Sequence, residues 1–505
     1  MQKSHNTSML QKPGRTLEQE FAAVRASMRR EYLDSWFLLG GWMGGTDTYK
    51  RTMSTADELF ALERAAYTLT FRKALPGMGD QLIMAGHEAM LSQWFRKPLQ
   101  RRRIQLYLEW YAKHSSVRAA PVKLWETLLS SQASDRLYLP IDIWGFPGGQ
   151  SFLKGVPALA VEGTGGFCSY PEPDVCRYFA PVIFATKARQ MLESTPRDAE
   201  FGLRAAPHRN LNLLLLLARY VGSGGRASMT SNDTAEFLYP DLFKAVGTVG
   251  HEGMCCHQSF DKSLAAAERE AMEQFVTAMG FASLLCDLID ALTLGKENAL
   301  AVIAAHPELL SIGFRVDSGD IAQQVVMLHQ EMIARGIDPR TIVFEDEVSP
   351  EKIKQVYDFF REKTGAEPKN LLPGAGGWWW RDLHRDTVSA AYKRAATGKN
   401  PNVKFSNSPG KESLGGYIRV YGQGDTMLVA DASERIDGMP LYHKLVDKGR
   451  IVYKESFQTQ AARADASWGQ YKKFKLSPLV QSYQDRFNAM RASEIAEFKA
   501  RHGLL

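Results

Sequence analysis

The 505-residue chain lacks the features that mark secreted, disulfide-rich or membrane-spanning proteins. It has five cysteines, an odd number spread over a long chain, which argues against a disulfide framework. Its longest apolar run, LNLLLLLA at 211–218, is too short to cross a bilayer and predicts a buried helix. The first residues, MQKSHNTSMLQKPGRTLEQEF, contain no apolar signal core, so we expect a cytoplasmic protein without a membrane partner.

A strong charge of one sign is also missing. The net charge is +6, from 62 basic and 56 acidic residues. A nucleic-acid-binding protein usually concentrates its basic residues in one stripe. The densest basic stretch here, RKPLQRRR at 96–103, is short and typical of a solvated helix face. We therefore expect no nucleic acid partner, whereas a mildly basic chain suits small anionic substrates.

Composition and length indicate a soluble protein of two or three domains, with 45% hydrophobic and 23% charged residues. The first part, 1–35, is polar and predicts an N-terminal extension. Residues 36–195 mix helical segments with short apolar runs and predict an α+β region. Residues 196–425 have a strand–loop–helix rhythm. The tail, 426–505, is mixed again and is expected to pack with the α+β region.

The rhythm of the central region predicts parallel strands joined by crossover helices. LLSIGFRVDSGD precedes the helical stretch IAQQVVMLHQEMIARG, and RTIVFEDEVS precedes PEKIKQVYDFFREK. Several such units in series favour an α/β barrel or a doubly wound sheet. In both folds the functional site lies where the strands end and the loops begin.

Carboxylates and glycines recur at these predicted strand ends. Carboxylates there can bind sugar hydroxyls or hold Mg²⁺ through water, and a Gly-rich turn can offer its N–H groups to a phosphate. The combination indicates a ribose-phosphate ligand with Mg²⁺, although each turn alone could be an ordinary solvated loop. The residues are Arg315, Asp317, Ser318, Gly319 and Asp320 of RVDSGD, Glu345, Asp346 and Glu347 of FEDEVS, Asp287 and Asp290 of LCDLID, and Gly374, Gly376 and Gly377 of PGAGG.

Two further segments could bind ligand. VKFSNSPGKESLGG at 403–416 is rich in small residues, and its Lys404 and Lys411 could hold a phosphate, or they could be routine surface lysines. In EFGLRAA at 200–206, Phe201 could stack on a planar ring and Arg204 could pair with a carboxylate or phosphate. A phenylalanine at this position could equally be part of the core.

The stretch AVGTVGHEGMCCHQSF at 245–260 holds several residues that could bind a metal. His251 has Cys255 at i+4, and His257 at i+6 points elsewhere on a helix, so the spacing does not fit a helical zinc site. Cys255 and Cys256 are adjacent and form no C-x-x-C motif. We expect no metal-ligating residues here, and we expect both cysteines to be buried in the following helix. The GTVGHE segment would place His251 in the ligand-binding cleft at the strand ends.

Nine motifs follow one another between about residues 40 and 425. They are TDTYKRTM (46–53), YTLTFR (67–72), EFGLR (200–204), MTSND (229–233), VGTVGHE (246–252), LCDLID (285–290), GFRVDSGD (313–320), GAGG (374–377) and KFSNSPGKESLGG (404–416). In this order they resemble the nicotinate and nicotinamide phosphoribosyltransferases, the type II enzymes of NAD salvage.

This resemblance implies an α/β fold: an irregular α/β barrel joined to an α+β domain built from N- and C-terminal segments. It implies a homodimer whose sites are completed across the interface. The implied reaction joins the ring nitrogen of the pyridine to C1 of phosphoribosyl pyrophosphate, with Mg²⁺ as cofactor and ATP as co-substrate. ATP would be hydrolysed through a phosphohistidine.

The resemblance also suggests a role for individual residues. Tyr49 of the neighbouring subunit and Phe201 would sandwich the pyridine, Arg204 and Arg315 would meet its carboxylate or the phosphoribosyl phosphate, and Ser231 would face the carboxylate. Asp317 would bind the ribose hydroxyls. His251 would be the phosphorylated nucleophile, oriented by Glu252, Asp287 or Asp290. The phosphates would be bound by Gly376, Gly377, Asp346, Arg385, Lys404 and Lys411, and by Arg72 at the adjacent site.

Two departures from the family pattern leave alternatives open. Glu345 stands before Asp346 where the family usually has glycine, and Trp378–Trp380 follow the glycine turn. Ser231 stands where nicotinamide-selective members have an acid, which favours nicotinate over nicotinamide. A degenerate, non-catalytic homologue is another possibility. A sugar-phosphate aldolase or isomerase would need a lysine on a strand for a Schiff base, and the strand ends given above have none.

Overall fold

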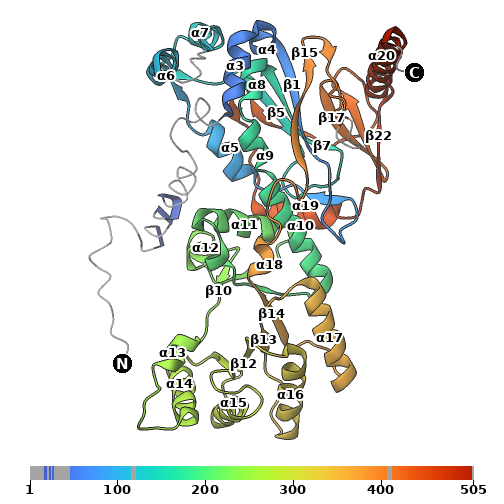
Figure 1. The fold of residues 1–505 in the computed structure, drawn as a ribbon. Coiled ribbons are helices and arrows are strands. Elements are labelled where there is room, and N and C mark those ends of the chain that lie inside the picture. Colours follow the sequence, from blue (N-terminus) through green and yellow to red (C-terminus); the bar gives the residue numbers. More distant parts are fainter. Residues whose placement is uncertain are drawn as a thin grey trace. The chain divides into compact units, whose positions relative to one another are not determined.

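The computed structural model describes residues 46–114, 121–406 and 412–502, together with isolated positions between 16 and 27. The chain folds as two compact units (Figure 1). The first comprises Met1–Thr186, Leu217–Gly224 and Leu383–Leu505 within the described residues, and the second comprises Lys187–Leu216 and Gly225–Asp382. The predicted extension 1–35 lies almost wholly outside the described residues, and the domain boundaries given above stay predictions.

The first unit is built on a seven-stranded sheet in the order β16-β15-β1-β7-β5-β20-β21. All its pairs are antiparallel, so strands from both ends of the sequence are joined in one sheet. This confirms the α+β domain built from N- and C-terminal segments. The strands are β1 (Arg64–Phe71), β5 (Ile141–Gly145), β7 (Pro157–Thr164), β15 (Ala390–Thr397), β16 (Asn400–Pro401), β20 (His443–Asp447) and β21 (Arg450–Ile451).

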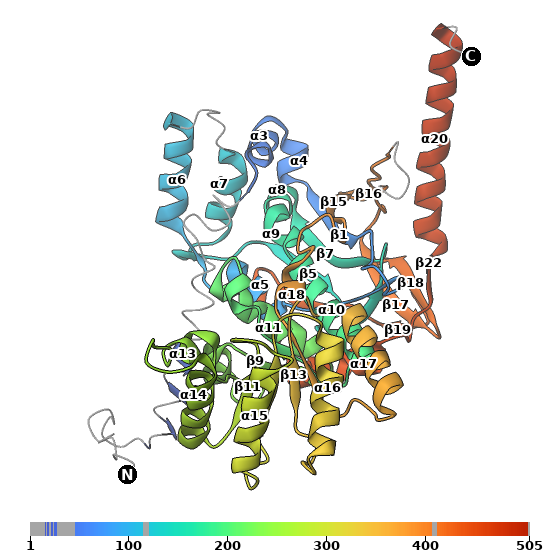
Figure 2. The ribbon, with the colours of Figure 1, turned by 60° about the horizontal axis from the view of Figure 1, so that its bottom comes forward.

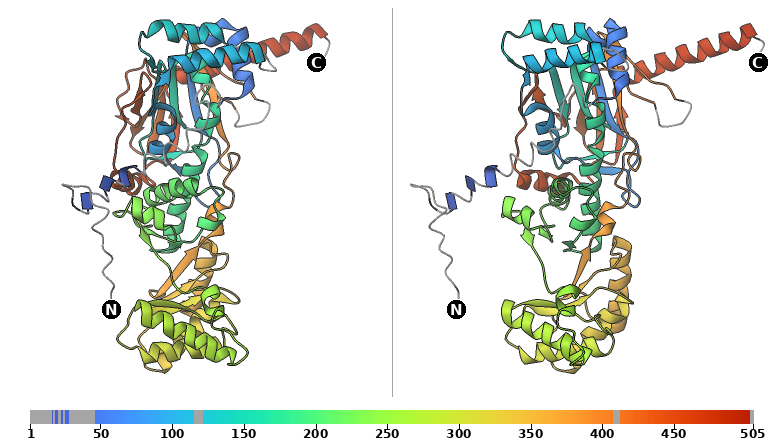
Figure 3. Two further views of the ribbon diagram at one scale, coloured as in Figure 1. Left: turned by 90° about the vertical axis from the view of Figure 1, so that its left-hand side faces the viewer. Right: turned by 60° about the vertical axis from the view of Figure 1, so that its left-hand side comes forward.

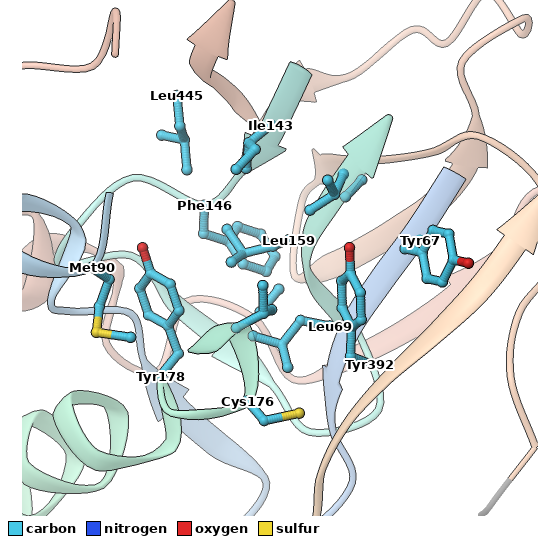
Figure 4. Packing of buried hydrophobic residues seen from close by; sticks show 14 of the residues in the cluster. Tyr67, Leu69, Met90, Ile143, Phe146, Leu159, Cys176, Tyr178, Tyr392 and Leu445 are labelled. Atoms are coloured by element: carbon cyan, nitrogen blue, oxygen red, sulfur yellow. The ribbon is translucent and has the colours of Figure 1, made fainter. Parts of the chain in front are cut away.

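β15 belongs to the first unit and pairs with β1 along its whole length, although it falls within residues 196–425, which were predicted to form the barrel domain. Buried apolar side chains of the two strands pack together. The rings of Tyr67 on β1 and Tyr392 on β15 stack with centroids 5.1 Å apart and an interplanar angle of 17°. Figure 4 shows these two rings beside Leu69 in the buried cluster of this unit.

Helices and a second sheet complete the first unit. A four-stranded sheet runs in the order β19-β17-β18-β22, and α20 packs on β18 and β22 and extends beyond them (Figure 2). The additional elements are α3 (Thr48–Ala56), α4 (Glu58–Leu62), β2 (Gln81–Ile83), α5 (His87–Phe95), β3 (Leu99–Gln100), α6 (Arg101–His114), α7 (Val122–Ser131), β4 (Arg136–Leu137), β6 (Ser151–Leu153), α8 (Gly165–Ser169), α9 (Glu172–Cys176), β17 (Ile418–Gln423), β18 (Thr426–Asp431), β19 (Met439–Pro440), α19 (Phe457–Ser467), β22 (Lys473–Leu476) and α20 (Pro478–His502). Figure 3 shows α6 and α7 side by side.

The second unit contains a curled, entirely parallel sheet of seven strands in the order β10-β9-β8-β14-β13-β12-β11. It confirms the α/β barrel expected from the strand–loop–helix rhythm, in the form of a half-barrel. The strands are β8 (Ala199–Glu200), β9 (Met229–Thr230), β10 (Lys244–Ala245), β11 (Ala282–Leu285), β12 (Ile312–Val316), β13 (Ile342–Phe344) and β14 (Leu371–Ala375).

Helices follow the strands of the second unit in chain order. In Figure 2 the helices α14, α15, α16 and α17 form a row, in which α14 contacts α15 and α16 contacts α17. The helices that follow the strands are η2 (Leu203–Ala205), α12 (Asp233–Leu238), α13 (His251–Cys255), α14 (Leu264–Met279), α15 (Leu294–Ala305), α16 (Ile321–Ala334), α17 (Pro350–Thr364) and α18 (Gly377–Trp380), while α10 (Phe179–Ser194) and α11 (Arg209–Gly222) cross the boundary between the units.

Local sequence signals explain where these helices begin and end. The Asp320 carboxylate accepts from the Gln323 N–H at 3.0 Å and caps α16, and Ser349 caps α17 immediately before Pro350. Gly365 ends α17 with φ 68°, a backbone conformation that glycine adopts without strain. The leucine run of α11 is buried, as predicted, and no described helix is long and apolar enough to span a bilayer.

The side chain of Thr248 connects the two edge strands of the curled sheet, β10 and β11. β10 and β11 share no ladder among the described residues, but Thr248, just after β10, reaches Ser283 on β11. The Thr248 hydroxyl donates to the Ser283 carbonyl oxygen at 3.1 Å and accepts from the Ser283 N–H at 2.8 Å. Thr248 therefore satisfies both backbone groups of Ser283 and holds the loop that leads to His251.

We predict that Thr248→Val weakens this connection, because valine keeps the shape but leaves two backbone groups of Ser283 without a partner. An unmet hydrogen bond of this kind costs about 1–3 kcal/mol, so the amides of 282–285 should exchange roughly ten- to hundredfold faster. Hydrogen–deuterium exchange by mass spectrometry measures this. Thr248→Ser keeps the hydroxyl and should exchange like the wild type; equal protection in Thr248→Val would contradict the bridging role.

Candidate functional site

The most prominent polar cluster of the second unit lies at the carboxyl ends of β11 and β12 and around His251. His251 is the first residue of α13, and its Nε2 lies 2.9 Å from Oδ1 of Asp287. The hydroxyl of Ser318 donates to the other oxygen of Asp287 at 2.5 Å. On the opposite side of the ring, Nδ1 lies 3.7 Å from Oδ2 of Asp317. With Nε2 donating to Asp287, the neutral ring carries its lone pair on Nδ1.

Asp287 is therefore the carboxylate that orients His251. Glu252, a predicted alternative, is exposed on α13. Asp290 is exposed and accepts a hydrogen bond from the Thr293 hydroxyl at 2.5 Å. The side chain of His251 is 40% exposed, so the ring remains accessible to a ligand.

A second group of charges continues from this cluster onto β13. Arg315, on β12, donates from a terminal nitrogen to Oε2 of Glu345 at 3.0 Å and to Oδ2 of Asp317 at 3.3 Å. Its Nε lies 2.8 Å from Oε1 of Glu345, but the N–H is not aimed at that oxygen, so this contact is an ion pair without a hydrogen bond. Burial raises the pKa of Glu345 to about 7. The positive charge of Arg315 acts in the opposite direction, and the negative charge of Asp317 acts in the same direction.

The aromatic part of the site is shaped by a glycine. A Cβ on Gly374 of β14 would lie 2.4 Å from Cε2 of Phe201 and 3.0 Å from Cγ of Glu345, so both side chains pack against this glycine. The Phe201 N–H donates to the Ala375 carbonyl at 2.9 Å, which fixes the loop after β8. At Gly377 nothing lies within 4 Å of a built Cβ, so its backbone is open to a ligand.

Glu200 anchors this part of the site and was not singled out from the sequence. It is completely buried, and Oε1 accepts from the Gly202 N–H at 2.6 Å while Oε2 accepts from the Thr230 hydroxyl at 2.9 Å. The Ser231 N–H donates to the Glu200 carbonyl at 2.9 Å. One residue thus fixes the two loops that carry Phe201 and Ser231. An acid directly before an aromatic and a glycine, at a strand end, is the signal that could have found it.

The tryptophan run has a structural role in the second unit. Trp379 is fully buried, and its ring contacts that of Trp378 at 4.9 Å between centroids. The Lys187 ammonium donates to the carbonyl of Trp378 at 2.9 Å and to that of Arg381 at 2.6 Å, and it lies over the Trp378 ring. Burial lowers the pKa of Lys187 to about 8. Lys187 therefore secures the end of α18, the element that begins at Gly377.

The remaining predicted residues of the second unit lie at the same strand ends. Arg204 is exposed in η2, and Asp320 serves as the cap of α16. Asp346 and Glu347 have φ values of 70° and 49°, a left-handed conformation that aspartate tolerates but that is strained for glutamate. The loop after β13 is therefore a strained turn that carries three adjacent carboxylates.

The other predicted ligand-binding residues belong to the first unit. Tyr49 is 48% exposed and donates to Glu172 at 3.1 Å, and Arg72 donates to the Glu412 carbonyl at 3.2 Å. Arg385 pairs with Asp386 at 2.8 Å. Lys404 is exposed, and its N–H donates to the Ser413 hydroxyl at 2.8 Å across the base of its loop. Lys411 lies outside the described residues.

One prediction was wrong. Cys255 and Cys256 are exposed, not buried in the helix that follows His251. The reason is that α13 is a short helix whose buried residue is Met254, and α14 begins only at Leu264. Among the residues that the structure describes, no group of three or more His, Cys, Asp or Glu side chains is placed to hold a metal ion.

The described structure has the fold of the nicotinate phosphoribosyltransferase class. It resembles human nicotinic acid phosphoribosyltransferase with a TM-score of 0.61 at 19% identity, covering 86% of this chain and 98% of that one. Nicotinate-nucleotide pyrophosphorylase from Pyrococcus furiosus gives a TM-score of 0.59 at 15% identity, covering 92% and 100%. Identities this low show the fold alone.

Sequence similarity points to the particular family. Residues 201–413 match the model of the Nicotinate phosphoribosyltransferase (NAPRTase) family. Nicotinate phosphoribosyltransferase of Photorhabdus laumondii is 29% identical over 175 residues, 33% of this chain and 40% of that protein. Nicotinate phosphoribosyltransferase pncB1 of Mycobacterium tuberculosis is 28% identical over 279 residues, 54% of this chain and 57% of that protein. The chain thus aligns with less than two thirds of these relatives.

We predict that Glu200→Ala destabilises the second unit, because the Gly202 N–H and the Thr230 hydroxyl lose buried acceptors. The expected loss is about 2 kcal/mol in the free energy of unfolding, after allowance for removing a buried carboxyl. Urea unfolding measures it. Glu362→Ala is the control, since its ion pair with Lys363 is exposed and should contribute little. An unchanged unfolding midpoint for Glu200→Ala would refute the anchoring role.

Proposed function

We propose that the protein transfers the phosphoribosyl group of phosphoribosyl pyrophosphate to nicotinate, forming nicotinate mononucleotide and pyrophosphate in NAD salvage. One observation supports this proposal: a chain of contacts links charged and polar side chains at adjacent strand ends. Its members are His251, Asp287, Asp317, Arg315 and Glu345, and all of them lie inside the region that matches the family. In this reaction the ring nitrogen forms a bond to C1 of the ribose. The bond from C1 to the pyrophosphate oxygen breaks, and pyrophosphate leaves with the electron pair.

The second unit offers a suitable group for each part of this reaction. Phe201 would stack on the pyridine, and Arg204 or Arg315 would meet its carboxylate. Asp317 would bind the ribose hydroxyls and stabilise the positive charge that develops at C1 as pyrophosphate departs. The N–H groups of Gly376 and Gly377 would receive the 5′-phosphate; the open space at Gly377 supports this.

The first unit would supply the remaining groups. In a homodimer Tyr49 of the neighbouring subunit would take the second face of the pyridine, and Arg72 would reach the pyrophosphate of the adjacent site. Arg385, Lys404 and Lys411 would bind phosphate as positive charges, while Asp346 would approach the phosphoribosyl group from the loop after β13. Mg²⁺ would enter with the pyrophosphate group of the substrate.

ATP hydrolysis would be coupled through His251. The lone pair of Nδ1 would attack the γ-phosphorus of ATP, ADP would leave, and water would later hydrolyse the phosphohistidine. Support comes from the Asp287 contact, which holds Nε2 as the donor and stabilises positive charge on the phosphorylated ring. Asp287 is itself fixed by Ser318, whose carbonyl accepts from Gln324 at 2.7 Å.

The choice of nicotinate over nicotinamide depends on Ser231. Its loop is fixed by the contact of its N–H with Glu200, and no acid occupies this position to repel a carboxylate. Asp233, two residues on, is exposed in the first turn of α12. Nicotinamide is the alternative substrate. A non-catalytic nucleotide-binding homologue is the alternative of another class, favoured only by the added carboxylate of Glu345 and by the tryptophan run Trp378–Trp380.

The decisive assay supplies purified protein with phosphoribosyl pyrophosphate, Mg²⁺ and either base, with and without ATP. We expect nicotinate mononucleotide, detected by liquid chromatography and mass spectrometry, and faster turnover with ATP. Product from nicotinamide alone would overturn the choice of substrate. Absence of product with both bases would reject the proposed activity and favour the non-catalytic alternative.

A matched pair of histidine variants tests the phosphohistidine. His251→Ala should lose ATP-stimulated turnover and acid-labile phosphate, because the ring that accepts the phosphoryl group is gone. His257→Ala removes a histidine that instead faces Glu270 at 3.3 Å, and it should behave like the wild type. If ATP stimulation survives in His251→Ala, the role given to His251 is wrong.

Gly374→Ala tests the aromatic pocket. The added methyl group would displace the Phe201 ring and the Glu345 side chain, so the KM for nicotinate should rise about tenfold or more, in line with 1–3 kcal/mol for overpacking. Gly247→Ala is the control, because nothing lies within 4 Å of its built Cβ. Steady-state kinetics in nicotinate at saturating phosphoribosyl pyrophosphate would show the difference. An unchanged KM in Gly374→Ala would place the pyridine elsewhere.

A further inference from the structure

The guanidinium of Arg315, a group that could bind an anionic ligand, already contacts a carboxylate of this chain. Two nitrogens of the guanidinium face the two oxygens of Glu345, at 2.8 Å and 3.0 Å. The terminal nitrogen makes a hydrogen bond and Nε an ion pair, so Glu345 lies along an edge of the guanidinium that a carboxylate or phosphate of a ligand could otherwise meet. The side chains of Arg315 and Glu345 are only 18% and 12% exposed, so solvent screens the pair weakly.

Glu345 also lies next to the aromatic wall of the site. Its Cγ and the Phe201 ring both pack against Gly374, within 3.0 Å and 2.4 Å of the built Cβ. An acidic pyridine stacked on Phe201 would therefore bring its own carboxylate close to that of Glu345. Two carboxylates near one guanidinium repel each other, and they cannot both face the same Nε–Nη2 edge.

We propose that Glu345 is a specificity-determining residue that competes with the carboxylate of nicotinate for Arg315, so that its protonation controls the affinity for nicotinate but not for nicotinamide. This inference rests on the proposed function, since it takes the pyridine to lie on Phe201. The ligand class it concerns is an aromatic ring bearing a carboxylate.

The direction of the pH dependence follows from the charges around Glu345. Arg315 and Asp317 on the β12 side are the charged groups that face it, and His251 lies beyond Asp317. From the β14 side it meets Gly374, while Glu200 is the last residue of β8 and Arg204 lies in η2. The pKa of Glu345 is raised to about 7. Below that pH the protonated side chain releases Arg315 to a ligand, and above it the carboxylate retains the arginine.

Isothermal titration calorimetry with nicotinate and with nicotinamide at pH 6 and pH 8 tests the proposal, because neither compound changes its charge in this range. For one group of pKa about 7, the Kd of the wild type for nicotinate should rise about tenfold from pH 6 to pH 8. The Kd for nicotinamide should stay within about twofold. Glu345→Gln keeps the shape without the charge, so it should bind nicotinate at pH 8 about tenfold more tightly than the wild type does.

The control is Glu347→Gln, an exposed carboxylate of the same turn, which should keep the wild-type pH dependence. Nicotinamide binding by Glu345→Gln shows that the variant retains its pocket. A tenfold pH effect that survives in Glu345→Gln, an equal effect on nicotinamide, or no nicotinate binding by any variant would overturn the proposal. Product formation without the pH effect overturns only this inference, whereas the pH effect without product overturns only the proposed activity.

Discussion

The guanidinium of Arg315 is the positive charge around which the carboxylates of the second unit are arranged. It neutralises Glu345 and contacts Asp317, which in turn lies beside His251, and Asp287 holds the far side of the imidazole. Without this cation, carboxylates on three neighbouring strand ends would repel one another in a partly buried place. The parallel sheet makes the arrangement possible, because it brings the carboxyl ends of β11, β12 and β13 to one edge.

Much of this could be predicted from the sequence. The alternation of apolar runs, polar turns and helical stretches specified the parallel sheet, since each of β11 to β14 is short, apolar and followed by a helix. The same rule placed Asp317 and Glu345 directly after their strands, and Asp287 two residues after the end of β11. His251 was correctly placed at a helix start, and Asp287 was among the candidates for its partner.

Other features depend on distances that no local pattern encodes. The hydrogen bonds of Thr248 with Ser283 require β10 and β11 to end at particular positions. The ion pair between Arg315 and Glu345 requires a particular register between the adjacent strands β12 and β13. The role of Glu200 depends on two loops that meet only in the folded sheet. The exposure of Cys255 follows from the shortness of α13, which a helical reading of the sequence did not reveal.

The central claim is that these strand ends form a nicotinate site. A crystal structure of the protein with nicotinate and phosphoribosyl pyrophosphate tests it most directly. We expect the pyridine ring to stack on Phe201, its carboxylate to lie near Ser231 and within hydrogen-bonding distance of Arg315 or Arg204, and C1 of the ribose to lie beside Asp317. A pyridine bound away from Phe201 and Ser231, with these residues unchanged, would show that the strand ends are not the nicotinate site.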